Sequence, residues 1–284
     1  MPAKMPTVIS VNSSKTLGPV KFMNAVNNGP TKPRADQSKG NFETYKALKI
    51  PYARIHDANW SSAYGAPHTV DITAIFPNFD ADPADPSNYD FAFTDYYIAQ
   101  LEANGLKAYY RLGITIENHA EIKSYHTAPP KDYDKWARIC EHIIAHYNEG
   151  WADGFHYNIE YWEIWNEPDC HIADGSNPCW QGSEAEFAEF FAVATGYLKE
   201  KFPHLKIGGP ALASIRHDEV NEAHLCKIRE YGVKPDFLSF HCYGKTVERF
   251  TESIDMARKA ADKYRKQRHN GVEETVEIIE KHSG

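Results

Sequence analysis

Strand-like and helix-like segments alternate regularly along this chain of 284 residues. Runs rich in β-branched and aromatic residues predict six strands, at 21–27, 50–57, 106–116, 161–167, 205–212 and 236–244. Helix-like segments with apolar residues three or four positions apart are expected at 38–48, 91–104, 132–149, 184–202, 217–231 and 246–265. Each helix follows one strand, and this order predicts βα units and a parallel sheet.

The spacing of these units favours a closed architecture over an open one. The units repeat about every 43 residues between Lys21 and Asp236, so a seventh strand is expected near 279, within "TVEIIEK" (275–281). An open doubly wound sheet is the alternative, but no GxGxxG or GxxxxGK[ST] follows the first strand. We therefore expect an α/β fold of the (β/α)8 TIM-barrel type, incomplete, with six clear βα units and 275–281 as the candidate for a seventh strand.

Composition and charge exclude several kinds of partner. Asp and Glu outnumber Lys and Arg by 39 to 31 without a block of like charges, so a nucleic-acid partner is not expected. No run approaches the roughly 18 apolar residues of a membrane helix, and the N-terminus lacks a secretory pattern. Five cysteines without a CxxC pair favour a reducing, cytoplasmic location, although secretion is not excluded. A disulfide between Cys170 and Cys179 is the less favoured alternative to free thiols.

Polar side chains collect where the predicted strands end. They are Asn24, Asn27, Asn28, Arg54, His56, Asp57, Arg111, Glu117, Asn166, Glu167, Asp169, His241 and Tyr243. In a barrel these positions share the rim that carries the active site. With the aromatic rings of Trp60, Trp165 and Tyr243, they suit a sugar, whose hydroxyls need polar partners and whose C–H faces need a ring.

A metal site is not expected from the sequence. The best pair, His142 and His146, has helical i, i+4 spacing but lacks the HExxH pattern. We interpret both as surface histidines on a helix outside the barrel, and we expect neither a metal nor another cofactor.

The segment "YWEIWNEPD" (161–169) is where the sequence says most about chemistry. In an extended strand Tyr161, Glu163, Trp165 and Glu167 would share one face. Because Pro168 cannot donate to a strand ladder, pairing should stop there and leave Glu167 at the barrel mouth. Glu163 lies deeper, where a buried, hydrogen-bonded structural role is favoured.

Glu167 is our candidate proton donor. A carboxyl desolvated by Trp162 and Trp165 can stay protonated near neutral pH and give its proton to a leaving-group oxygen. This is the general acid of glycoside hydrolysis. The alternative, a salt-bridged glutamate at the start of a loop, is less favoured for the full string WNEPD.

The chain resembles glycoside hydrolase family 39, the β-xylosidase and α-L-iduronidase family. The resemblance rests on ordered motifs: "NAVNNGP" (24–30), "IPYARIHD" (50–57), "YWEIWNEPD" (161–169), "KIGGPA" (206–211) and "DFLSFHCYG" (236–244). It implies a (β/α)8 barrel and a retaining mechanism with two glutamates. Glu167 matches the acid/base and Asn166 the residue that binds the sugar 2-hydroxyl, while His56, His241 and Tyr243 match sugar-binding positions.

The chain departs from the family pattern after residue 263. The family's nucleophile is a glutamate at the end of the seventh strand, usually followed by Trp-Asn, and no such string follows Glu167. Glu280 is the best-placed substitute, although a solvated helix or an unrelated terminus is the favoured interpretation of 263–284. We expect one catalytic barrel domain over 1–284, without the eighth strand or an accessory β-domain. Its two unpaired sheet edges favour a homo-oligomer unless something covers them.

The leading functional prediction is a retaining glycosidase that acts in xylan degradation. It would release terminal xylose from β-1,4-xylo-oligosaccharides, with a small oligosaccharide as its only expected partner besides a second copy. One alternative is a truncated or degenerate barrel that binds sugar without turnover. Another is an iduronidase-like enzyme, in which Arg54 and Arg111 would hold a uronic carboxylate.

Overall fold

The computed structural model describes most of the segments that carry the predicted elements. The described residues are 14–15, 18, 24–27, 29–30, 40–55, 70–114, 127–171, 173, 175–216, 225–226, 228–266 and 277–281, with side chains up to 262. Seven parallel strands form one sheet in the order of the sequence. They are β1 (Val26–Asn27), β2 (Tyr52–Ile55), β3 (Lys107–Leu112), β4 (Tyr161–Ile164), β5 (Lys206–Leu212), β6 (Phe237–His241) and β7 (Glu277–Lys281).

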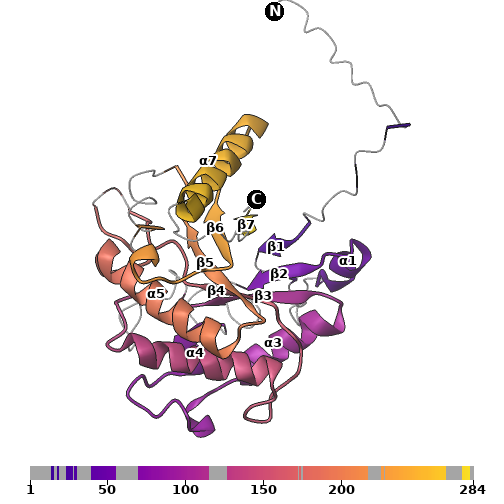
Figure 1. The fold of residues 1–284 in the computed structure, drawn as a ribbon. Coiled ribbons are helices and arrows are strands. Elements are labelled where there is room, and N and C mark those ends of the chain that lie inside the picture. Colours follow the sequence, from indigo (N-terminus) through magenta and orange to yellow (C-terminus); the bar gives the residue numbers. More distant parts are fainter. Residues whose placement is uncertain are drawn as a thin grey trace, which may run out of the picture.

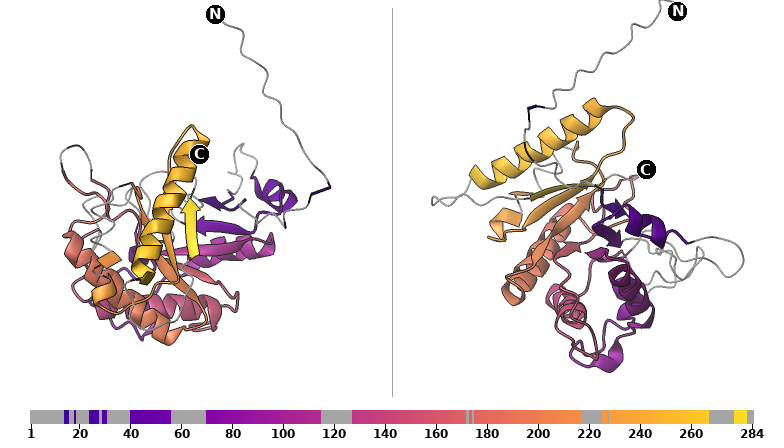
Figure 2. Two further views of the ribbon diagram at one scale, coloured as in Figure 1. Left: turned by 45° about the horizontal axis from the view of Figure 1, so that its top comes forward. Right: turned by 90° about the vertical axis from the view of Figure 1, so that its right-hand side faces the viewer.

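Helices cover the outer side of this curved sheet (Figure 1). They are α1 (Phe42–Ala47), α2 (Ile72–Ile75), the 3-10 helix η1 (Pro86–Asn88), α3 (Ala92–Ala103), α4 (Tyr133–Asn148), α5 (Glu184–Lys201) and α7 (Val247–Lys266). Figure 2 shows α7 lying along the outside of the sheet near β6 and β7. Of the predicted helix at 217–231, residues 217–224 and 227 lie outside the description, and 225–226 and 228–230 are helical.

The two long central helices begin at residues suited to helix N-termini. The Asp132 carboxylate accepts a hydrogen bond from the backbone N–H of Lys135, 2.8 Å away, at the start of α4. Ser183 and Glu186 form a capping box at the start of α5, in which each side chain bonds the backbone N–H of the other residue. Both helices then pack apolar faces on the sheet, as the sequence period predicts.

Two clusters of buried apolar side chains hold the layers together. The main cluster fills the space between β2–β5 and α3–α5, and its aromatic centre contains Trp136, Trp165, Trp180 and Phe190. A second cluster joins β5 and β6 to α7. Its buried members are Leu212, Ile215, Leu238, Phe240, Cys242 and Ala257.

The prediction of a partial (β/α)8 barrel is confirmed. All adjacent strands pair in parallel, and the sheet curls as in a TIM-type barrel. No eighth strand occurs among the described residues. Within that part of the chain, none of the helices is long and apolar enough to cross a membrane.

Candidate active site

The end of β4 departs from the predicted alternation of side chains. The strand stops at Ile164, and both Trp165 and Glu167 have left-handed backbone, with φ of 71° and 49°. The Trp165 ring consequently joins Trp136 and Trp180 in the outer core instead of lining the barrel mouth. The prediction that Tyr161, Glu163, Trp165 and Glu167 share one face is therefore wrong beyond Ile164.

The second predicted aromatic neighbour of Glu167 also lies elsewhere. The Trp162 ring stacks on Tyr110 with centroids 4.8 Å apart, and its indole N–H donates to the Ile159 carbonyl. Strand alternation sends this side chain to the helix-facing side of the sheet. The expected aromatic cage around the Glu167 carboxyl is thus not formed by Trp162 and Trp165.

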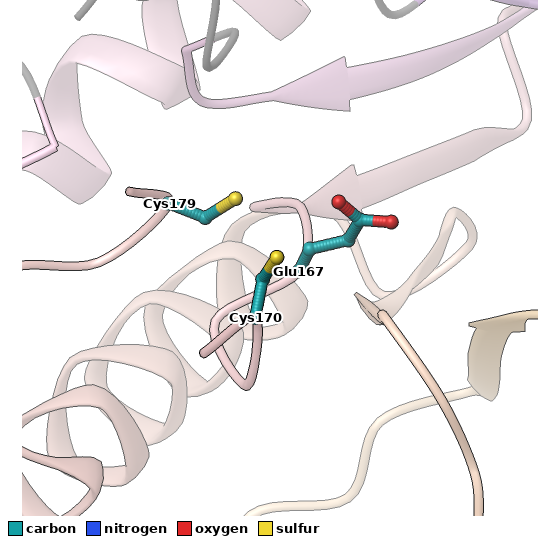
Figure 3. A group of neighbouring side chains, drawn as sticks. All are labelled: Glu167, Cys170 and Cys179. Atoms are coloured by element: carbon teal, nitrogen blue, oxygen red, sulfur yellow. The ribbon is translucent and has the colours of Figure 1, made fainter. Parts of the chain in front are cut away.

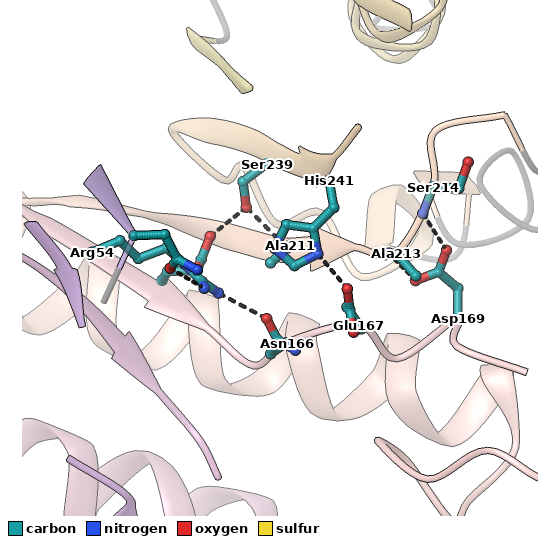
Figure 4. Close-up of polar contacts among 11 residues, drawn as sticks. Arg54, Asn166, Glu167, Asp169, Ala211, Ala213, Ser214, Ser239 and His241 are labelled. Atoms are coloured by element: carbon teal, nitrogen blue, oxygen red, sulfur yellow. Dashed lines mark hydrogen bonds and ion pairs between the residues drawn. The ribbon is translucent and has the colours of Figure 1, made fainter. Parts of the chain in front are cut away.

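Glu163 has the buried structural role that the sequence favours. Its carboxylate accepts hydrogen bonds from Arg54 Nε at 2.7 Å, from the Ser239 hydroxyl at 2.6 Å and from the Tyr109 hydroxyl at 3.3 Å. The contacts with Arg54 and Ser239, both labelled in Figure 4, tie β2 and β6 to β4. A buried carboxylate needs such partners to remain charged away from water.

Arg54 also fixes the orientation of Asn166. One guanidinium nitrogen, Nη2, donates to Asn166 Oδ1 at 2.9 Å, and another, Nη1, donates to Asn27 Oδ1 at 3.1 Å. Because a guanidinium can only donate, the amide oxygen of Asn166 must face it. The amide nitrogen Nδ2 is then left buried without a hydrogen-bond partner among the described residues, in a side chain that is 2% exposed.

Glu167 lies at the barrel mouth and contacts β6. Its carboxyl Oε1 is 2.5 Å from Nδ1 of His241, and its backbone N–H donates to the Ala211 carbonyl at 3.0 Å. The Glu167 side chain keeps 16% of its surface exposed, whereas His241 keeps 5%. A hydrogen-bonded carboxyl with partial access to solvent is suited to proton transfer with a bound substrate.

Tyr243 extends the site toward solvent. Its side chain is 58% exposed, and its ring centroid lies 6.3 Å from that of His241. An exposed aromatic ring beside polar groups can stack on the C–H face of a sugar.

Asp169 has a structural task that the sequence does not reveal. Its carboxylate accepts from the backbone N–H groups of Ala213 at 2.7 Å and Ser214 at 3.3 Å, and the side chain is 3% exposed. It thereby joins the loop after β4 to the loop after β5 (Figure 4). Asp169 therefore stabilises the rim through its backbone contacts, and we assign it no role in binding a ligand.

Two cysteines lie beside Glu167 (Figure 3). All five cysteines of the chain are free, so the less favoured disulfide between Cys170 and Cys179 is absent. Their thiols nevertheless interact: a hydrogen bond from Cys179 lowers the pKa of Cys170 and raises the pKa of Cys179. One ligand atom each from Glu167, Cys170 and Cys179 lies within 4.8 Å of the other two.

Five of the predicted rim residues lie outside the described residues: His56, Asn28, Asp57, Trp60 and Glu117. The sugar-binding role of His56 stays a prediction.

Position 280 lies in β7, so 277–281 is a strand of the sheet and not part of the solvated helix or unrelated terminus that the sequence favoured. In the β6–β7 ladder, position 280 pairs with Phe240, whereas Ser239 and His241 pair with positions 279 and 281. Phe240 belongs to the second cluster, on the α7 side of the sheet. This register alone does not bring position 280 to the site, and the nucleophile assignment stays a prediction.

The histidine pair on α4 is not a pair of surface side chains. His146 is buried, where its Nε2 lies 2.9 Å from Asp95 Oδ1 and its Nδ1 2.8 Å from the Trp151 carbonyl. His142 Nδ1 contacts the Arg138 carbonyl at 2.8 Å. Burial of His146 between α3 and α4 corrects the surface interpretation and gives the ring a packing role.

Sequence reasoning missed Ser239, which holds the Glu163 carboxylate. A signal was present, because Ser239 and His241 are two apart in one strand and so share a face. By contrast, the hydrogen bond from Tyr109 to Glu163 depends on the register between β3 and β4. Local sequence does not predict this register.

Asn166 and Glu167 place a buried amide beside a carboxyl at the end of the fourth barrel strand. The sequence motifs predict this arrangement for a glycosidase. The family model for "Glycosyl hydrolases family 39" matches residues 11–283. The chain belongs to glycosyl hydrolase family 39. Its partial barrel has the TIM-type fold of a solved family 39 structure.

The chain is also similar to individual proteins. A "Beta-xylosidase" of Geobacillus stearothermophilus is 24% identical over 204 residues, which are 66% of this chain and 38% of that protein. A glucosidase structure from Croceicoccus marinus has a TM-score of 0.70 at 26% identity, covering 85% of this chain and 48% of that one. A family 39 β-xylosidase structure from Caulobacter crescentus has a TM-score of 0.57 at 20% identity, covering 87% and 52%. The chain therefore spans about half or less of these relatives.

Proposed function

We propose that the chain is a retaining β-xylosidase that releases terminal xylose from β-1,4-xylo-oligosaccharides, with Glu167 as the general acid and base. The similarity to proteins named β-xylosidase supports the choice of sugar. The five free thiols fit the cytoplasmic location that forms part of the proposal.

The observation that carries this proposal is the pairing of Asn166 with Glu167. Arg54 turns the Asn166 amide so that its N–H group is buried and lacks a partner among the described residues. A buried donor of this kind is costly unless a ligand satisfies it. A sugar hydroxyl that accepts from Asn166 Nδ2 would also bring the glycosidic oxygen toward the neighbouring carboxyl of Glu167.

In the proposed mechanism, Glu167 first protonates the leaving-group oxygen as a second carboxylate attacks the anomeric carbon. Glu167 then deprotonates the water that hydrolyses the glycosyl–enzyme intermediate. His241 is within hydrogen-bond distance of Glu167 and would orient its carboxyl in both steps. The attacking carboxylate would come from Glu280, which needs to reach about 5–5.5 Å from Glu167 in a retaining enzyme.

The test compares two substrates in the Glu167→Gln variant. Hydrolysis of xylobiose should fall by roughly 10²–10⁴-fold, because its poor leaving group needs a proton. For an aryl β-xyloside with a strongly acidic phenol, the rate of the glycosylation step should fall less, because the phenolate leaves without protonation. The control is Glu160→Gln, which changes an exposed carboxyl near the start of β4. Equal losses on both substrates, or none, would reject Glu167 as the acid.

Sugar binding without turnover is the second candidate. It is favoured by the pairing of position 280 with Phe240 instead of with Ser239 or His241. Calorimetry with xylobiose beside the activity assay separates the two functions. Turnover that Glu280→Ala abolishes would reject the binding-only candidate, whereas heat of binding without turnover would support it.

The described residues favour a neutral sugar over a uronic acid. Arg54 is engaged by Glu163, and Arg111 Nη2 contacts the buried Asp71 carboxylate at 2.8 Å. Both guanidinium groups are thus already neutralised by carboxylates, so they are poorly suited to bind the carboxylate of an iduronide. A xyloside should accordingly be hydrolysed in preference to the matching uronide.

A further inference from the structure

The loop after β4 brings two thiols to the candidate acid. Cys170 follows Glu167 by three residues, and its backbone N–H donates to the Glu167 carbonyl at 3.1 Å, which closes a tight turn. Cys179 lies nine residues after Cys170, where the loop comes back to Glu167. Its Sγ, the Cys170 Sγ and a Glu167 carboxylate oxygen all lie within 4.8 Å of one another (Figure 3).

We propose that Glu167, Cys170 and Cys179 form a binding site for a thiophilic divalent cation, zinc above all. Two sulfur ligands and one carboxylate oxygen are ligand types that Zn²⁺ accepts, whereas Mg²⁺ and Ca²⁺ prefer oxygen alone. Three protein ligands leave the fourth tetrahedral position open to a water or a substrate hydroxyl.

The observed spacing is close to what a metal requires. Tetrahedral zinc with bonds of about 2.0–2.3 Å holds its ligand atoms roughly 3.3–3.8 Å apart. Atoms already within 4.8 Å reach this spacing by small side-chain rotations. A carboxylate has two oxygens, so Glu167 can keep His241 on one of them and bind the cation with the other.

The loop is held in place by contacts that need no ion. The Asn177 side chain accepts from the Cys179 backbone N–H at 2.9 Å and donates to the Pro168 carbonyl at 2.5 Å. The Cys179 carbonyl in turn accepts from the Trp165 indole N–H at 2.9 Å. The two halves of the loop, and with them the two thiols, are therefore positioned before any cation arrives.

Such a cation would compete with the proton on Glu167. A carboxylate bound to zinc cannot protonate a leaving group, so occupancy should switch off the reaction. This consequence depends on the proposed function, whereas binding itself does not. The two can therefore fail separately.

The test is titration of the reduced chain with Cd²⁺, followed by its ultraviolet cadmium–thiolate charge-transfer band, and competition by Zn²⁺. We expect one ion per chain with the band of two thiolates. Loss of an outer partner of a metal ligand already costs about 10–100-fold in affinity. Cys170→Ser, which removes a ligand itself, should therefore cost at least that much and remove half of the band.

The matched control is Cys226→Ser, which removes a half-buried thiol from another part of the chain. It should bind Cd²⁺ as the unchanged chain does. Glu167→Gln should keep the two-thiolate band but bind at least tenfold more weakly. Circular dichroism checks that each variant is folded.

Three outcomes would overturn the site: no charge-transfer band, an unchanged band in Cys170→Ser, or unchanged affinity in Glu167→Gln. If the chain hydrolyses xylosides, Zn²⁺ should inhibit it and a chelator should restore it, with Cys170→Ser at least tenfold less sensitive. Equal sensitivity to Zn²⁺ in Cys170→Ser and the unchanged chain would also overturn the site.

Discussion

Arg54 decides what Asn166 offers to a ligand. Its guanidinium binds the buried Glu163 carboxylate and the Asn166 amide oxygen at the same time. The amide nitrogen then points away from the guanidinium as a buried donor. The chemistry of the site thus depends on a contact between side chains 112 residues apart in the sequence.

Asn166→Asp tests the role of that donor. The new carboxylate can still accept from Arg54 but cannot donate to a sugar hydroxyl. We expect kcat/KM for a xyloside to fall by roughly 10²–10³-fold, as when one donor to a developing charge is removed. The free energy of unfolding should change less than in Asn166→Ala, which also loses the acceptor. Full activity in Asn166→Asp would refute the assignment.

Arg54→Met tests the stabilising part of the network. Breaking a buried ion pair by removing one partner leaves an uncompensated charge, here on Glu163, which costs about 3–5 kcal/mol. Arg54→Lys keeps the positive charge, so its free energy of unfolding should fall less than that of Arg54→Met. Urea denaturation of the two variants measures the difference, and equal losses would show that charge compensation at Glu163 is unimportant.

Helix α5 shows how a local signal can predict an element well. Ser183 and Glu186 form the capping box at its start, a pattern visible in the sequence as S-x-x-E. The helix then carries Phe187 and Phe190 into the main cluster. Its observed bounds, Glu184–Lys201, differ from the predicted 184–202 by one residue.

Ser183→Ala should destabilise the fold without touching the site. Loss of the side-chain acceptor leaves the N–H of Glu186 without its cap, which typically costs about 0.5–2 kcal/mol. Ser183→Thr keeps a hydroxyl and should retain most of the stability. Thermal unfolding of both variants provides the measurement. A Thr variant as unstable as the Ala variant would argue against capping as the cause.

The end of β4 is an element where local pattern fails. Strand periodicity continued past Ile164 places Trp165 on the face of Glu163, whereas the left-handed backbone at Trp165 turns its ring into the outer core. The backbone N–H of Trp165 donates to the Leu112 carbonyl, and the backbone N–H of Glu167 donates to the Ala211 carbonyl. These partners on neighbouring strands stabilise a backbone that ordinary residues rarely adopt.

At the scale of the whole molecule, the two apolar clusters differ in size. Among the described residues, the main cluster spans β2–β5 and helices α2, α3, α4 and α5, whereas the second cluster has six buried members around β6 and α7. Local stability follows the amount of apolar surface buried in each region. The part of the sheet that carries His241 is therefore held by the smaller cluster.

Native-state hydrogen exchange should reveal this division. Amides of β6 and α7 should exchange through an opening of lower free energy than amides of β3 and β4. Phe240→Ala, in the second cluster, should accelerate exchange mainly in β6 and α7. Phe190→Ala, in the main cluster, should cost about 3–5 kcal/mol and accelerate exchange across the sheet. Equal protection in both regions of the unchanged chain would contradict the division.

The sequence by itself determined the βα order, the approximate strands and the positions of Asn166, Glu167 and His241 at strand ends. These features follow from local periodicity and from motifs whose residues are close together in the chain. Tertiary structure alone decided which way Trp165 turns, how Arg54 orients Asn166, and that Cys170 and Cys179 meet beside Glu167. The first two depend on contacts between segments far apart in the chain, and the third depends on how one loop closes on itself, which residue periodicity does not encode.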